Sequence, residues 1–446
     1  MLLASPFARN LAQLSGATTV GGIIALGASP LIARLYPPSQ FGVLGVFATT
    51  LTLAMAVASL RYDFAIPYPK DKREAESVLA LALLTILAMT SAFALLILAG
   101  VPSLFPAVRN TLSGGLVWWL PIGMWASATY AALSIWMIRQ RDFATIGTTK
   151  ITQGALQAGS QIVLGVLGLG SSGLIVGQIV GSSSGLLRLS QRISQRNPHV
   201  LDGISRSKLV AIARTYRRFP LYSAPAVLLD SLAGAMPLFF IAARFGPAAA
   251  GLYTLVQRVI TMPFSLLTVN LGQVLFGDFA QIRRSDPASL MLVFRRRVLQ
   301  VGVLGLILIL PLLFIVPILL PRIFGERWGG ASLYFLILAP MTFASFVSSP
   351  FGFAIDVLRR QDLQLLRDSI RALIMGSAIA ISVCLHAGWR STLVLIAAAG
   401  AVNGILYLLV SWRAISSYER TNAGVSGTAD GPSPTGLDAE AFVELN

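Results

Sequence analysis

The sequence predicts an all-α integral membrane protein with about twelve transmembrane helices, arranged as two six-helix lobes around a central cavity. Composition predicts the membrane class: 55% of the 446 residues are hydrophobic and only 12% are charged. The mean hydropathy of +0.75 is far above that of a water-soluble protein. The recurrence of long apolar runs gives the number of helices, and the positions of basic residues give their orientation.

Twelve runs of roughly 20 apolar residues, the length that crosses the hydrocarbon, lie between charged or Pro/Gly-containing breaks. The eleventh run is the least regular, because Arg367, Asp368 and Arg371 make its first half amphipathic. The predicted spans are residues 11–35, 41–60, 77–101, 115–138, 144–169, 172–189, 221–243, 249–276, 298–320, 331–357, 363–385 and 391–412.

The flanks of these spans differ sharply in charge. On the side of the membrane where the odd-numbered spans end, the basic residues are only Arg34, Arg109, Arg244, Arg322, Arg327 and Arg390. Clusters of basic residues such as those in 70–73 and 283–297 lie on the opposite side. Basic residues favour the cytoplasmic side, so both termini are predicted to be cytoplasmic. The net charge of +16 is then mainly a signal of topology, and nucleic acid is not an expected partner.

The connections predict a simple domain organisation. An N-terminal six-helix lobe, residues 1–190, is followed by a basic cytoplasmic linker, residues 191–218, and a C-terminal six-helix lobe, residues 219–416. Residues 417–446 are small, polar and acidic, which is typical of a disordered tail, here cytoplasmic.

A loose internal repeat supports two similar halves. The stretch "ARLYPPSQFGVL" from Ala33 recurs as "ARFGPAAAGLY" from Ala243, with one residue deleted and the Arg, Pro and Gly positions kept in order. Six predicted spans separate the copies, so the halves have the same orientation in the membrane. Transporters built in this way place the substrate site between their halves.

The eighth predicted span carries a permanent charge near its middle, Arg258. Polar and small residues accompany it at steps of three and four, a spacing that predicts one helix face: Thr254, Arg258, Thr261, Ser265, Thr268 and Gly272. A mid-span arginine costs a few kcal/mol by insertion scales, so we expect it to face a polar cavity or a partner. Asp230, near the middle of the seventh span, is a candidate partner, and a packing salt bridge without a ligand is the alternative.

A second polar stripe, Lys150, Gln153, Gln157 and Gln161, lies along one face of the fifth span. Its alternative interpretations are substrate binding, or snorkelling of Lys150 combined with interhelix hydrogen bonds from the glutamines. Arg34 and Arg61 lie at span ends, where snorkelling is again the alternative to substrate binding. A cationic cavity lined by hydroxyl groups favours an anionic substrate, because guanidinium groups match phosphate oxygens.

Other chemistry has little support in the sequence. The single cysteine, Cys384, excludes an intrachain disulfide, and the two histidines, His199 and His386, are far apart. No nucleotide-binding loop is present. We therefore expect no metal, no cofactor and no enzyme activity.

Several segments of the chain match a known family pattern. The most specific is "RYDFAIPYPK" from Arg61, and others are "RLYPPSQFGVLGVF" from Arg34, "WMIRQRDFATIGTTKITQG" from Trp136 and "GLYTLVQRVITMPFSLL" from Gly251. In these segments the chain resembles bacterial polysaccharide flippases of the O-antigen and capsule type, which belong to the multidrug/oligosaccharidyl-lipid/polysaccharide exporter superfamily. Together the similar segments bracket about four-fifths of the chain.

The resemblance implies a transporter in the bacterial plasma (inner) membrane. It would flip an undecaprenyl-pyrophosphate-linked oligosaccharide from the cytoplasmic to the periplasmic leaflet by alternating access, for O-antigen, capsule or exopolysaccharide synthesis. Implied partners are this glycan, membrane lipids and other assembly proteins, such as a polymerase and a chain-length regulator.

The resemblance also points to site residues. Arg258 matches the family's R-x-x-x-x-P position, with Pro263 following it, Arg61 falls in the RY pair, and Lys150 matches a basic or polar position. Asp230 is a candidate for ion coupling.

Three alternatives differ in what they require. A drug/cation antiporter of the same superfamily needs acidic residues in its cavity, and Asp230 is the main mid-span acid. A major-facilitator transporter needs a Gly-x-x-x-Asp-Arg loop after the second span, which is absent. A membrane glycan polymerase or ligase resembles its relatives in carrying a large outer loop, whereas the longest loop of this chain is predicted to lie inside.

Overall fold

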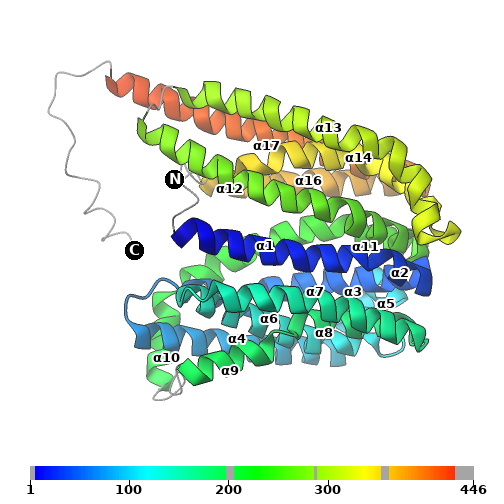
Figure 1. Ribbon diagram of the computed structural model, residues 1–446, viewed down its shortest axis with the longest axis horizontal. Coiled ribbons are helices and arrows are strands. Elements are labelled where there is room, and N and C mark those ends of the chain that lie inside the picture. The colour runs from blue at the N-terminus through cyan, green and yellow to red at the C-terminus, as the bar shows by residue number, and fades with distance from the viewer. Residues whose placement is uncertain (1–5, 197–204, 286–288, 353–360, 427–446) are drawn as a thin grey trace.

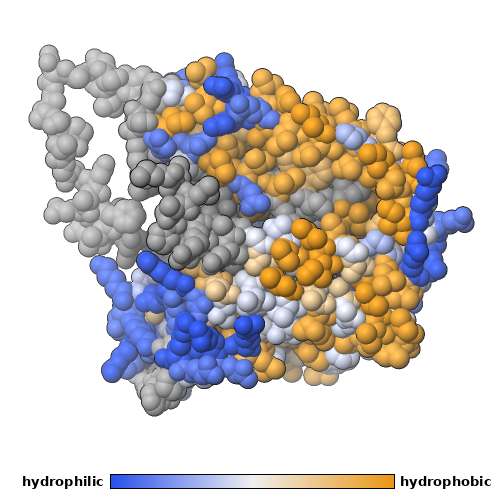
Figure 2. All heavy atoms as spheres, viewed as in Figure 1, coloured by the Kyte–Doolittle hydropathy of each residue, from blue (hydrophilic) through white to orange (hydrophobic). Residues whose placement is uncertain are grey.

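The computed structural model of the chain describes residues 6–196, 205–285, 289–352 and 361–426, and this part contains helices and no β-strand (Figure 1). The predicted all-α membrane class is confirmed. Eight helical segments of the described part are long and apolar enough to cross a bilayer. Large apolar side chains such as Leu98, Ile307 and Phe314 are exposed. Hydrophobic residues cover much of the visible surface between the hydrophilic patches at the two ends (Figure 2). A bilayer would cover such a surface. The count of twelve spans and the division into two lobes stay predictions.

The first half of the chain forms the lower part of the molecule in Figure 1. Several helix starts follow from local sequence: Pro38 and Pro106 occupy the first turn, where no N–H partner is lost, and Asp71 and Asp142 accept hydrogen bonds from the first turns they precede. The helices are α1 (Pro6–Gly27), α2 (Ser29–Leu35), α3 (Pro38–Ala58), α4 (Lys72–Leu98), α5 (Pro106–Thr111), α6 (Trp119–Arg139), α7 (Phe143–Val166), α8 (Gly170–Ser183), α9 (Leu186–Arg196) and α10 (Arg206–Thr215), with the 3₁₀ segments η2 (Tyr62–Ala65), η3 (Val101–Leu104) and η4 (Leu116–Trp118).

The second half begins with a π-helical turn, η5 (Phe219–Ser223), and most of its helices form the upper part of Figure 1. The helices are α11 (Ala224–Val256), α12 (Met262–Ser285), α13 (Leu290–Phe324), α14 (Gly330–Ser348), α16 (Gln361–Cys384) and α17 (Trp389–Ser426), with the π-helical segment η6 (Gln257–Thr261) and the 3₁₀ segments η8 (Glu326–Trp328) and η9 (Ser349–Phe351). Helix α17 continues past residue 417, where the tail was expected to begin, and residues 427–446 lie outside the described part.

Helix α11 contains a sharp bend that matters for the site. Gly246 has φ 84° and ψ 176°, a conformation that glycine adopts without a steric penalty. In a straight helix, Gly234 and Tyr253 would lie about 28 Å apart. Both residues instead line one cavity, so the chain folds back at Gly246. The predicted spans 221–243 and 249–276 therefore correspond to two arms, and the second arm continues through η6 into α12.

The two copies of the internal repeat pack against each other along the contact of α3 with the second arm of α11. A Cβ atom on Gly42 would meet the carbonyl oxygen of Pro247, and a Cβ atom on Gly251 would meet that of Pro38. Gly42 and Gly251 are matching positions of the repeat, so the contact is reciprocal. Only glycine lets the two backbones approach this closely, as at many helix interfaces in membranes. We call this contact the glycine seam.

The molecule has two distinct ends in Figure 1, which we call the α2 end and the α10 end. At the α2 end, the buried indole of Trp328 donates a hydrogen bond to the Ala33 carbonyl at 2.9 Å, and its ring meets Phe41 edge-on with centroids 4.9 Å apart. At the α10 end, basic side chains gather over α4, α9 and α10 (Figure 2). Exposed members are Lys70, Lys72, Arg73, Arg188, Arg196, Arg206, Lys208 and Arg214.

Candidate functional site

Arg258 joins the two halves of the chain, because it contacts α1 and α7 from η6. It lies in η6 and is half-buried. Its Nη2 atom is 3.4 Å from the side-chain oxygen of Gln161 in α7 and 3.5 Å from the carbonyl oxygen of Ala25 in α1. The expectation that this charge faces a polar partner is therefore confirmed. We call Arg258, Gln161 and Ala25 the Arg258 junction.

Gln161 is held so that one of its oxygens faces the guanidinium group. The residue is fully buried, and its side-chain nitrogen donates to the Leu174 carbonyl at 3.2 Å. Its backbone carbonyl accepts from the Tyr36 hydroxyl at 2.7 Å. These bonds leave the side-chain oxygen to accept from Arg258. Both acceptors of the Arg258 junction are neutral, and no carboxylate in the described part of the chain pairs with this arginine. Its charge is solvated but not balanced.

The other glutamines of the α7 stripe connect α7 to α8. The Gln153 amide donates to the Ser182 carbonyl at 3.0 Å, and the Gln157 amide donates to the Gln178 side chain at 2.6 Å. The interhelix hydrogen bonds that we weighed against substrate binding are thus present. Half-buried Lys150 lies 3.3 Å from Gln153 and 5.0 Å from the Tyr130 ring centroid, and its substrate-binding role stays a prediction.

Arg34 and Arg61 lie at opposite ends of the molecule, and neither contacts Arg258. At the α2 end, Arg34 donates to the carbonyls of Ile323 and Arg322 at 3.1 and 3.2 Å. These carbonyls end α13, where a cation is favoured by the helix dipole. At the α10 end, Arg61 lies 3.5 Å from the Phe64 ring centroid and 3.4 Å from the Ser223 hydroxyl. Burial lowers the pKa of Arg61, and the Asp63 charge opposes that shift.

The structure corrects the expected partner of Asp230. Its carboxylate pairs with Arg371 of α16 at 2.5 Å, and not with Arg258. The difference arises because the two segments face different neighbours: the first arm of α11 faces α16, while Arg258 in η6 faces α1 and α7.

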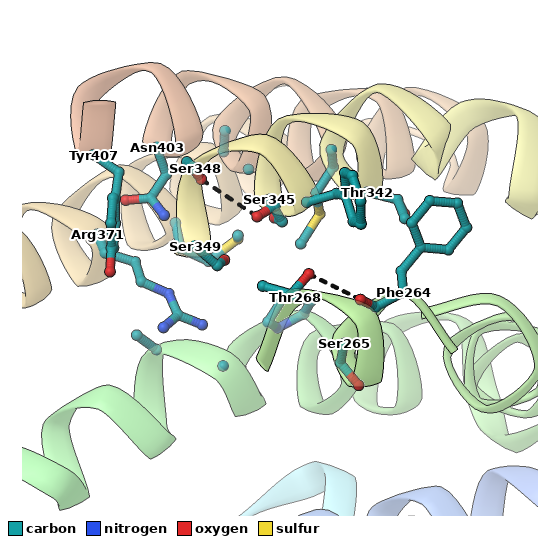
Figure 3. A pocket seen from close by; sticks show the side chains of 18 of the residues that line it. Phe264, Ser265, Thr268, Thr342, Ser345, Ser348, Ser349, Arg371, Asn403 and Tyr407 are labelled. Carbon is teal, nitrogen blue, oxygen red and sulfur yellow. Dashed lines mark hydrogen bonds between the residues drawn. The ribbon is translucent and has the colours of Figure 1, made fainter. Parts of the chain in front are cut away.

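The predicted polar face of the eighth span is also divided. Thr254 meets Gly45 of α3 in the glycine seam, whereas Thr268 lies beyond the π-helical segment and faces α14 (Figure 3). A π-helical turn adds a residue and so rotates the helix beyond it. The side chain of Thr261 is outside the part of the chain whose side chains the structure describes, so its predicted role is not tested.

A cavity of about 500 Å³, lined by both apolar and polar side chains, lies among α11, α12, α14, α16 and α17, and we call it the C-terminal cavity. Its volume is within the range of small-molecule sites. Figure 3 shows Thr268 facing Thr342 and Ser345 across one part of it, with Arg371, Asn403 and Tyr407 at the other. Further lining residues are Tyr253, Gln257, Ser348, Ser349, Arg367 and Asp368.

Most of these residues were not identified from the sequence, although a signal exists. Thr342 and Ser345 of α14 and Ser349 at the start of η9 follow each other at steps of three and four, and Asn403 and Tyr407 are one turn apart on α17. Scattered hydroxyl groups leave a helix apolar on average, so the hydropathy that identifies spans does not mark them.

Comparison with known proteins places this chain in a family. The sequence profile described as "polysaccharide biosynthesis protein" matches residues 31–333, which is more than half of the chain. The chain belongs to the polysaccharide biosynthesis protein family. No curated protein matches the sequence of this family member.

Solved structures similar to this family member show which fold it shares. The lipid II flippase MurJ, in an inward closed conformation, aligns with TM-score 0.68 and 13% identity over 94% of this chain and 93% of its own. A multidrug resistance MATE family transporter, in an inward-facing conformation, aligns with TM-score 0.58 and 16% identity over 92% of this chain and 95% of its own.

A MOP superfamily transporter from Pyrococcus furiosus aligns with TM-score 0.58 and 16% identity over 92% of this chain and 96% of its own. Each of these three proteins is a transporter or a flippase, and none of the three is an enzyme.

Proposed function

We propose that this protein flips an undecaprenyl-pyrophosphate-linked oligosaccharide from the cytoplasmic to the periplasmic leaflet of a bacterial plasma membrane. The product would serve the synthesis of O-antigen, capsule or exopolysaccharide. Membership in the polysaccharide biosynthesis protein family supports the pathway. The fold shared with a lipid II flippase supports the mechanism.

The observation that carries the proposal is the unbalanced charge of the Arg258 junction. Arg258 lies in a segment predicted to cross the bilayer, where an isolated cation is costly, and its contacts are long bonds to neutral oxygens. A diphosphate would supply the missing negative charge, and its oxygens fit the planar guanidinium fork. An anionic lipid-linked substrate therefore suits the site better than a cation.

Alternating access requires a contact between the halves that opens and closes. We assign residues 1–190 and 219–416 as the moving lobes, with the glycine seam between them. The basic side chains of the α10 end mark it as cytoplasmic by the positive-inside rule. The α2 end is then periplasmic, and Arg34 and Trp328 hold it closed in this conformation.

A drug/cation antiporter of the same fold is the second candidate, and the cavity charges disfavour it. A cation exporter needs a carboxylate that is free to bind cations. Asp230 is paired with Arg371, and Asp368 is paired with Arg367 at 2.6 Å. Asp368, which lines the C-terminal cavity, and Asp230, which pairs with a lining arginine, are therefore already neutralised.

Gene deletion followed by complementation tests the proposed function. The deletion strain should accumulate a lipid-linked oligosaccharide, identified by mass spectrometry of the lipid extract, and lose its surface glycan. Wild-type protein should reverse both effects, and Arg258→Ala should reverse neither despite normal membrane levels. Arg109→Ala is a matched control, because Arg109 is exposed and bonds only to its neighbour Asn110 among the described residues. Absence of any accumulated lipid-linked glycan would refute the proposal.

A further inference from the structure

The C-terminal cavity differs from the Arg258 junction in being electrically balanced. Arg367 donates from Nε and Nη2 to one oxygen of Asp368, at 2.8 and 2.6 Å, and Arg371 pairs with Asp230. Each cation at the cavity thus has its own carboxylate. A diphosphate would have to displace one of these carboxylates, whereas a neutral ligand would leave both pairs intact.

The walls of the cavity carry donors and acceptors side by side. Thr268, Thr342 and Ser345 present hydroxyl oxygens on one side (Figure 3), where the first two hydroxyls already donate to carbonyls of their own helices. Arg367, Arg371 and Asp368 present N–H donors and carboxylate oxygens on the other side. Hydroxyl, amide and carboxylate groups in such a mixture are suited to a ligand with many hydroxyl groups, each of which both donates and accepts. The rings of Tyr253 and Tyr407 also line the cavity, and the Arg367 guanidinium lies 4.5 Å from the Tyr407 ring centroid.

Asn403 is the most informative residue of the lining. It is half-buried, and no described residue forms a hydrogen bond with its amide. A polar group in a partly enclosed site normally has a partner, because leaving it without one costs free energy. Its amide offers one acceptor and two hydrogens to whatever occupies the cavity.

The cavity is placed next to the proposed diphosphate site. Gln257 lines the cavity, and the next residue, Arg258, faces Gln161 and Ala25. One turn of η6 therefore presents consecutive side chains to the two sites. A ligand with a charged group and a neutral polyhydroxyl group joined to it could occupy both.

We propose that the C-terminal cavity binds a neutral sugar of the lipid-linked glycan while Arg258 binds the diphosphate. This inference rests on the proposed function. Under it the two sites bind different parts of one substrate: the Arg258 junction recognises what every polyprenyl-diphosphate carrier shares, and the cavity recognises the glycan.

Binding to the purified full-length protein in lipid nanodiscs tests the inference. The probes are the lipid-linked oligosaccharide extracted from the deletion strain and bare undecaprenyl pyrophosphate. Wild-type protein should bind the oligosaccharide-bearing lipid about tenfold more tightly than the bare lipid, the gain expected from a few hydrogen bonds. Asn403→Ala and the cavity-filling Ser345→Leu should remove that gain and leave binding of the bare lipid unchanged.

Two comparison variants separate the possible outcomes. Asn270→Ala replaces an exposed asparagine of α12 outside the cavity lining and should change neither affinity, while Arg258→Ala should weaken both. If Asn403→Ala, with wild-type thermal stability, keeps the tenfold gain, the cavity is not the sugar site and the proposed function stands. If wild-type protein binds neither lipid, the proposed function fails, and this inference fails with it.

Discussion

The Arg258 junction and the C-terminal cavity share the segment η6, which contributes Arg258 to the first and Gln257 to the second. The arginines of the two regions nevertheless differ in how their charges are paired. At the junction, one cation faces two neutral oxygens at 3.4 and 3.5 Å. At the cavity, two arginines are each matched by a carboxylate. The comparison shows that a buried arginine is not evidence for an anion site until its partners are known. Only the unbalanced cation calls for a negative ligand.

The largest effect is expected from the glycine seam, where α3 and the second arm of α11 pack backbone against backbone. Gly251→Leu should abolish accumulation of folded protein, because any side chain would collide with the Pro38 carbonyl and the two backbones would have to separate. We expect a cost above about 3 kcal/mol, at the upper end for a single substitution. Fluorescence-detected size exclusion of the detergent extract measures it.

Gly277→Ala is the matched control for the seam, because a Cβ atom there meets no other atom within 4 Å. This exposed position on α12 should tolerate alanine and gain helix propensity. A folded Gly251→Leu protein with normal yield would show that the seam is not a tight contact.

Replacing the charge of the junction in steps gives the next largest effect. Arg258→Gln should weaken binding of undecaprenyl pyrophosphate about 100-fold, and Arg258→Lys about tenfold, since lysine keeps the charge but loses the planar fork. The same substitutions at Arg371 should change this affinity little, because that charge is already neutralised by Asp230. Equal losses at Arg258 and Arg371 would erase the distinction between the two regions.

A smaller effect is expected at the α2 end, where the two halves meet away from both sites. Trp328→Phe keeps an aromatic ring against Phe41 but removes the hydrogen bond to the Ala33 carbonyl. Loss of that bond should destabilise the protein by about 1 kcal/mol. Thermal unfolding in detergent measures the loss, and the accessibility of a cysteine introduced near Ala33 should rise as the periplasmic closure weakens. An unchanged accessibility would argue against a closing role for Trp328.

The smallest effect is expected from exchanging the charges of one ion pair at the cavity. The Asp230 and Arg371 side chains are 46% and 36% exposed, so solvent screens their attraction and each single neutral substitution should cost about 1 kcal/mol or less. The double variant Asp230→Arg with Arg371→Asp should recover most of the loss in unfolding temperature. A double variant as unstable as the sum of the single ones would mean that the pair is held by something other than its charges.

The sequence predicted the membrane class and a polar partner for Arg258, because hydropathy and an isolated charge are local properties. It predicted the wrong partner for Asp230, because that choice depends on which helix packs against the first arm of α11, and α16 brings Arg371 there. The π-helical segment that divides the polar face of the eighth span has no strong sequence signal. The sequence showed the spacing of the α7 glutamines but not their partners. Gln153 and Gln157 form hydrogen bonds with α8, and the Gln161 side chain accepts a hydrogen bond from Arg258.

Transport in proteoliposomes tests the central claim most directly. Protein reconstituted with a fluorescent undecaprenyl-pyrophosphate-linked oligosaccharide should move the lipid between leaflets, measured as the fraction that an external quencher reaches over time. We predict rapid equilibration with wild-type protein and with the Arg109→Ala control, and a rate close to that of protein-free vesicles with Arg258→Ala. Wild-type rates with a correctly folded Arg258→Ala variant would contradict the account, because the diphosphate would then need no cation at this position.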